Sequence, residues 1–267
     1  MNIRQLITRA GLVASGAIAL SAPAYAFSFQ TNYTSALSGA DAAKGDIILN
    51  SVTLGSGKVV SDFTMVTSAN ILSNDIYTGG DSGAASADIG DLANGISEEA
   101  LTNQSAAAVL SNLNLNNIID TEDNGNFILD LNFERAVDNI FIWERGMNSR
   151  LDIQALDASG NEIGNKVQLA NSKNWDYAGF DIDTKEISSA QRVGSIGVSL
   201  ADLGISNTFI SSLRVSSQGQ AYNGPDFKLI GSIAEQSQTV PEPSVLLGLG
   251  AVVAGLLATC RRKGQTT

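Results

Sequence analysis

An uncharged stretch of 16 residues, Val245 to Cys260, lies near the C-terminus and is closed by Arg261-Arg262-Lys263. We expect it to form a transmembrane helix over 245–260, although a freely spanning helix usually has about 20 apolar residues. The basic cluster then stays on the cytoplasmic side of the membrane. Before the helix stands Pro241-Glu242-Pro243, where proline holds the chain extended because it cannot continue a helix or a sheet ladder. The segment 240–263 is therefore predicted to be separate from the folded body.

The N-terminus has the pattern of a secretory signal peptide. Two arginines lie within the first nine residues, an uncharged stretch follows over Ala10 to Ala22, and Ala24-Tyr25-Ala26 forms a small-residue cleavage site. Residues 1–26 are predicted to be a signal helix that is removed, which leaves Phe27 as the first mature residue. An uncleaved anchor helix is the alternative, and the short apolar core and Pro23 disfavour it.

The remaining residues, 27–239, suffice for one secreted domain with its own core. They contain no cysteine, because the single one is Cys260, so the domain must fold without disulfides. The chain has no histidine. This composition excludes Ser-His-Asp and Cys-His catalysis and histidine metal sites. We therefore predict a protein that is not an enzyme.

The net charge of the body limits which classes of partner it can bind. The whole chain carries a net charge of −11, and five of its basic residues lie in the two terminal segments. The body is therefore more acidic than the chain as a whole. Such a surface argues against nucleic acid or anionic lipid as a partner, and it allows divalent cations to bridge to acidic polysaccharide.

Short runs of β-forming residues, separated by Gly, Asn and Asp, predict a mainly β fold. The predicted strands are Asp46–Val52, Lys58–Val66, Phe127–Phe133, Val137–Glu144, Leu151–Leu156, Lys166–Leu169, Tyr177–Ile182, Val193–Leu200, Ile210–Val215 and Phe227–Ile233. Strands at this spacing favour an antiparallel β-sandwich of jelly-roll type. One inserted α-helix is expected near 98–113, with Ser97 as its N-cap. It either packs on a sheet, which is the ordinary expectation, or binds a partner.

The tail, through Pro241-Glu242-Pro243, the apolar run 245–260 and Arg261-Arg262, resembles the PEP-CTERM sorting signal. That resemblance implies export, temporary membrane anchoring, cleavage near the tripeptide by an exosortase, and transfer to the cell surface or its polysaccharide matrix. A plain C-terminal membrane anchor has the same physical features and remains the alternative. The segments Asn114–Asp120, Phe141–Ser149 and Gly224–Phe227 resemble a group of cyanobacterial exosortase-dependent surface proteins, a resemblance that implies location but no activity.

One acidic loop has the spacing of calcium ligands. Oxygen-bearing side chains alternate along it, at Asp120, Glu122, Asn124 and Asn126, with Gly125 in the sixth position. However, Leu131 occupies the twelfth position, where a calcium loop of this type needs a bidentate Glu. The alternative is a solvated turn before a strand, which Asp and Asn favour through local hydrogen bonds. Otherwise no cofactor is expected.

Aromatic residues next to polar ones offer a carbohydrate-binding alternative. Trp175 and Tyr177 lie in a polar segment predicted to be exposed, and Trp143 stands beside a Glu144–Arg145 pair. Trp143 is more readily explained as a core residue, with Glu144 and Arg145 pairing at the strand end. Glycoside hydrolysis needs two carboxylates about 5 to 10 Å apart, and Glu144 is the least unsuitable member of such a pair.

These observations predict a secreted surface or matrix protein, associated with exopolysaccharide or biofilm, that is anchored and processed through its C-terminal signal. A carbohydrate-binding module acting on exopolysaccharide is the alternative, and a hydrolase is a more distant one.

Overall fold

The structure, a computed structural model, describes residues 26–80, 82–170, 175–206 and 208–234. This part of the chain is mainly β and antiparallel, with one α-helix, as predicted. Its strands are β1 (Phe29–Ser35), β2 (Ile47–Leu54), β3 (Val59–Val60), β4 (Phe63–Thr64), β5 (Val66–Asn74), β6 (Ala85–Ile89), β7 (Asn117–Thr121), β8 (Asn126–Arg145), β9 (Arg150–Leu156), β10 (Glu162–Ala170), β11 (Asp176–Ile182), β12 (Gln191–Ser199), β13 (Ile210–Gln218) and β14 (Phe227–Ile233). The helix is α1 (Asn103–Leu110). The predicted signal helix and transmembrane helix lie outside the described residues.

The 20-residue strand β8 organises the larger sheet. Its first half pairs with β5 and β13, and its second half pairs with β12 and β14. The sheet continues from β13 to β9 and β10, and from β14 to β7 and β6. The sequence had predicted two strands here, and the structure joins them into one.

Both halves of β8 contribute side chains to one core. Odd-numbered residues point into this core from the first half, and even-numbered residues point into it from the second half. Leu129 and Leu131 point into it from the first half, and Ile140 and Ile142 from the second. Val137 still has the parity of the first half, and the register against β14 shifts between Val137 and Asn139, as at a β-bulge, where one extra residue bends the strand. The sheet thereby folds over a shared core in a sandwich-like arrangement.

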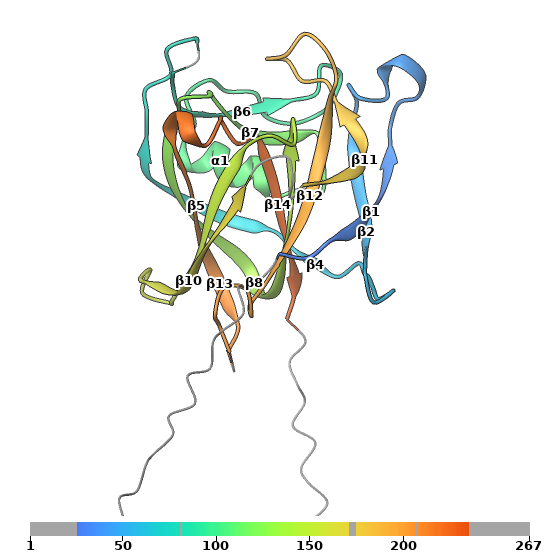
Figure 1. Ribbon diagram of the computed structural model, residues 1–267. Coiled ribbons are helices and arrows are strands. Elements are labelled where there is room, and N and C mark those ends of the chain that lie inside the picture. The colour runs from blue at the N-terminus through green and yellow to red at the C-terminus, as the bar shows by residue number, and fades with distance from the viewer. Residues whose placement is uncertain (1–25, 81, 171–174, 207, 235–267) are drawn as a thin grey trace, which may run out of the picture. The chain divides into compact units, whose positions relative to one another are not determined.

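A second sheet, in the order β1-β2-β3, covers the outer face of this arrangement. Its apolar side chains form a second core with residues of β8 and β11. The ring of Phe29 lies 5.0 Å from that of Phe141 and 5.4 Å from that of Trp143, between centroids. Figure 1 shows β1 and β2, in blue, beside β11 and β12. This third layer was not predicted from the sequence.

The helix is shorter than expected and begins later. Thr102, not Ser97, is its N-cap, and it forms a capping box with Ser105. Glu98 instead exchanges two backbone hydrogen bonds of 2.8 Å with Ala87, so it lies at a sheet edge rather than in a first helical turn. The apolar side of α1 packs against β5 and β7 (Figure 1).

Candidate functional site

Arg145, a buried residue at the end of β8, lies close to several carboxylates. Its Nη1 lies 3.3 Å from Asp88 Oδ2, and its Nη2 lies 2.5 Å from Asp120 Oδ2 and 2.8 Å from Asp226 Oδ2. Nη1 also donates to Thr184 Oγ1 at 2.6 Å. With the neighbouring Glu186, we call these residues the Arg145 cluster, and its members are Asp88, Asp120, Arg145, Thr184, Glu186 and Asp226.

Strand pairing explains why two of the carboxylates meet. In the β6–β7 ladder Ser86 pairs with Asp120, and Asp88 pairs with Ile118. Paired residues point to the same face, as do residues two apart along a strand. Asp88 and Asp120 therefore lie on the same face as Ile118, which belongs to the second core.

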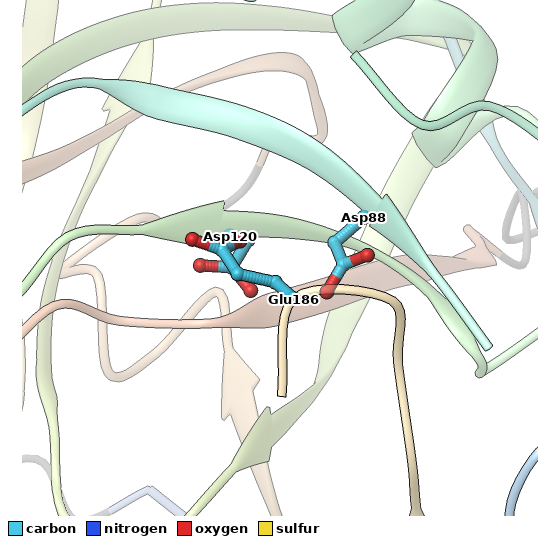
Figure 2. Close-up of side chains that lie close together, drawn as sticks. All are labelled: Asp88, Asp120 and Glu186. Carbon is cyan, nitrogen blue, oxygen red and sulfur yellow. The ribbon is translucent and has the colours of Figure 1, made fainter. Parts of the chain in front are cut away.

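Glu186 completes an acidic trio with Asp88 and Asp120 (Figure 2). One carboxylate oxygen from each lies within 4.8 Å of the others. Burial, and then the charge of Asp120, raises the pKa of Glu186 to about 8. Burial, and then the charge of Asp226, raises the pKa of Asp120 well above its ordinary value. The crowding of like charges thus favours proton retention in the trio.

The guanidinium compensates only part of this negative charge. Burial opposes ionisation of Arg145, but the charges of Asp226, Asp120 and Asp88 more than offset it and raise the pKa of Arg145 above its ordinary value. Burial raises the pKa of Asp226 to about 6. A cavity of about 360 Å³ opens onto the cluster, and Glu122 and Asp123 also line it. Chemically, the arrangement can share protons between carboxyl groups or present oxygen atoms to a hard cation.

The predicted calcium loop falls beside this cavity. Asp120 accepts from Arg145, whereas Asn126, at the other end of the loop, donates to Asp75 Oδ2 at 2.7 Å. Glu122 lines the cavity with Asp120, and the Gly125 amide donates to the Glu122 carbonyl in a tight turn before β8. The first and last of the four residues Asp120, Glu122, Asn124 and Asn126 thus have different partners, and calcium binding stays a prediction.

Both tryptophans proposed for carbohydrate binding are buried. Trp143 is 1% exposed and Trp175 is 4% exposed. Trp143 Nε1 donates to Thr31 Oγ1 at 2.9 Å, and Trp175 Nε1 donates to the Ser149 carbonyl at 3.1 Å. Since the rings lie in the two cores, neither can stack on a sugar, and the expected exposure of Trp175 was wrong. Of the three aromatic candidates, only Tyr177 is exposed, at 44%.

Glu144 and Arg145 do not form the expected ion pair, because neighbouring residues along a strand point to opposite faces of the sheet. Glu144 is 1% exposed, and neither of its carboxylate oxygens has a hydrogen bond of standard geometry. Burial raises the pKa of Glu144 to about 8, more than the Ser149 hydroxyl, the Met147 amide and the charge of Arg145 lower it. This carboxyl is thus enclosed in protein.

Most predicted processing residues lie outside the described residues: Ala24, Pro241, Glu242, Pro243, Arg261 and Arg262. Ala26 is described, and it packs against the main core. In the part of the chain that the structure describes, no helix has the length and apolar character needed to span a membrane. A comparison with protein-family models found no match, and a search of curated proteins also found none.

Proposed function

We propose that this chain is an exported surface protein that its C-terminal segment retains at the membrane and presents for cleavage by an exosortase. The order of features in that segment carries the proposal. Pro241-Glu242-Pro243 comes first, the uncharged run 245–260 second and Arg261-Arg262 last. An accessible cleavage segment must lie outside the membrane, and this order places it on the same side as the body.

The position of the last strand supports the proposal. Strand β14 ends at Ile233, shortly before the proline-containing tripeptide. A cleavage segment between a folded body and a membrane helix is expected to follow the body closely in this way.

In this proposal the body is not an enzyme, and it associates with exopolysaccharide or biofilm matrix outside the cell. The lack of histidine supports this, as does the enclosure of Glu144. The jelly-roll form of the sandwich remains part of the proposal, and the fold of the sheet about β8 supports it. Calcium remains a candidate ligand of the acidic loop at Asp120 to Asn126.

The experiment is cell fractionation combined with the intact mass of the protein recovered from the surface. The wild-type mass should correspond to a chain that begins at Phe27 and ends near Pro241-Glu242-Pro243. Replacing both prolines, Pro241→Ala and Pro243→Ala, should leave a longer, membrane-bound form, since the chain is no longer held extended for cleavage.

The matched control replaces two residues just before the tripeptide, Gln236→Ala and Gln238→Ala, and should be processed as the wild type is. An unchanged surface fraction after the two proline substitutions would count against sorting through this segment. A full-length chain in the surface fraction, with residues 245–267 still attached, would favour a plain membrane anchor instead.

A further inference from the structure

An exposed tyrosine on β11 is held in a fixed position. The hydroxyl of Tyr177 donates to Asp181 Oδ1 at 2.9 Å. The guanidinium carbon of Arg192, on β12, lies 4.0 Å from the centre of its ring, a distance typical of a cation–π contact. Because these contacts already order the side chain, a ligand that packs against the ring loses little affinity to side-chain ordering.

A second tyrosine is fixed next to it from the other sheet. Tyr33, on β1, donates its hydroxyl to the Gly179 carbonyl at 2.9 Å, and its ring lies 4.9 Å from that of Phe180. Gly179 has a φ of +93°, and a Cβ added there would meet no heavy atom within 4 Å. No side chain therefore covers the backbone at Gly179. Its carbonyl accepts the hydrogen bond from Tyr33, and it lies two residues after Tyr177 on β11.

Tyr33 and Tyr177 both line two cavities, which together we call the tyrosine groove. One, of about 660 Å³, is lined by Gln30, Thr53, Tyr33 and Tyr177 among others. The other, of about 360 Å³, is lined by Ser35, Asp181 and the same two tyrosines. Asp181 is the one charged residue among the described residues that line them, and it already accepts a hydrogen bond from Tyr177. The groove thus offers aromatic surface and uncharged polar groups.

We propose that the tyrosine groove binds a neutral polysaccharide chain. A pyranose ring presents an apolar face of C–H groups and a rim of hydroxyls, which match a tyrosine ring surrounded by hydrogen-bonding side chains. Among the described residues that line the groove there is no cationic side chain to pair with an acidic polymer, and the net charge of −11 repels such polymers. A single carboxylate cannot supply the acid and base pair of a glycosidase, so the groove binds rather than hydrolyses. This polymer would be the matrix component that the surface protein proposed above contacts, so its biological role rests on that function.

The test is affinity electrophoresis of the purified full chain, in mild detergent, through native gels containing dextran, galactomannan or hydroxyethyl cellulose, with alginate as an acidic polymer. At least one neutral polymer should retard the protein. Tyr177→Ala should weaken this binding by about tenfold, which corresponds to about 1.4 kcal/mol. Phe209→Ala is the matched control, because Phe209 is also 44% exposed but does not line the groove. It should bind as the wild type does.

A second variant tests the groove independently if Tyr177→Ala lowers the melting temperature of the protein. Gln30→Trp fills the larger cavity from an exposed position without removing a tyrosine contact, and it should cause a similar loss. Retardation by alginate alone, by no neutral polymer, or equally in wild type and both groove variants would overturn the proposal. Binding to a protein partner alone would also overturn it. A failure of sorting would leave the retardation unchanged, so the two proposals can fail separately.

Discussion

Phe27 and Gly197 exchange both backbone hydrogen bonds, at 2.8 Å in each direction. The ring of Phe27 also lies directly over Gly197, where an added Cβ would come within 2.3 Å of a ring carbon. The residue that signal-peptide removal is predicted to leave first in the mature chain is therefore paired with β12 through an antiparallel bridge. Glycine at 197 is required because any larger side chain would occupy the position of the ring.

Gly197→Ala should destabilise the protein by roughly 1–3 kcal/mol, since overpacking forces the ring or the backbone to move. Thermal or urea unfolding would measure the loss. Gly55→Ala is the matched control, because an added Cβ there meets nothing within 4 Å, and it should be near neutral. In the double variant Phe27→Ala with Gly197→Ala, the cost of the alanine at 197 should largely disappear. An equal cost with and without the Phe27 ring would contradict the contact.

The same contact predicts the order of processing and folding. The predicted cleavage lies between Ala26, which packs against the core, and Phe27, which is hydrogen-bonded to Gly197. A protease that needs an extended peptide cannot reach this bond in the folded body. Purified signal peptidase should therefore cut a precursor held unfolded in mild urea much faster than the folded precursor. A control peptidase substrate in the same urea corrects for effects on the enzyme, and equal rates for both precursor forms would exclude this order.

Arg145 should contribute to stability mainly because it prevents uncompensated buried charge. Arg145→Met leaves Asp88, Asp120 and Asp226 without their cation and should cost about 3–5 kcal/mol near neutral pH. The loss should be smaller at pH 5, where more of these carboxyls are protonated, since the pKa of Asp226 is about 6. Urea unfolding at pH 5 and pH 8 would measure both values.

Arg214→Met provides the comparison for that experiment. Arg214 pairs with Asp130 and Glu162, but its side chain is 23% exposed. Its loss should cost less than that of Arg145, roughly 1 kcal/mol, as expected for a pair that is partly accessible to solvent. Equal losses for the two variants, or a loss for Arg145→Met that does not change with pH, would argue that buried charge in the Arg145 cluster is unimportant.

Glu144 should make the folded state less stable as the pH rises. Its pKa is about 8 in the folded protein against 4.5 for an ordinary Glu, so the folded state binds its proton more tightly. The stabilisation is complete below about pH 4.5 and is lost as the pH rises through 8. Glu144→Gln should therefore flatten the fall in melting temperature between about pH 5 and 8. Glu134→Gln, on an exposed side chain of the same strand, should leave the slope unchanged.

Sequence patterns located the strands that contain apolar runs. The last strand, Phe227–Ile233, has the predicted bounds, and β11 differs by a single residue. Strand β6 was missed because Ala85-Ser86-Ala87-Asp88 alternates apolar and polar side chains but contains no β-branched or aromatic residue before Ile89. It is buried on both faces, so neighbouring strands rather than its own propensity decide its structure.

The Arg145 cluster could not be assembled from the sequence, because its members come from five separate segments of the chain. Asp120 had been noticed for its local spacing, and Arg145 for its neighbour Glu144. A basic residue at the end of an apolar strand was the available signal, since a buried guanidinium needs carboxylate partners. Choosing Asp88 and Asp226 as those partners requires the β6–β7 and β8–β14 ladders, whose pairings a single sequence does not specify.

Strand β8 also bears on how a domain without cysteines remains intact. Its main chain belongs to both halves of the folded-over sheet, so an unbroken peptide backbone links them where many secreted domains use a covalent sulfur bridge. Neither half can separate from the other without breaking the backbone hydrogen bonds that it forms with β8. The two halves should consequently melt together, in one cooperative transition.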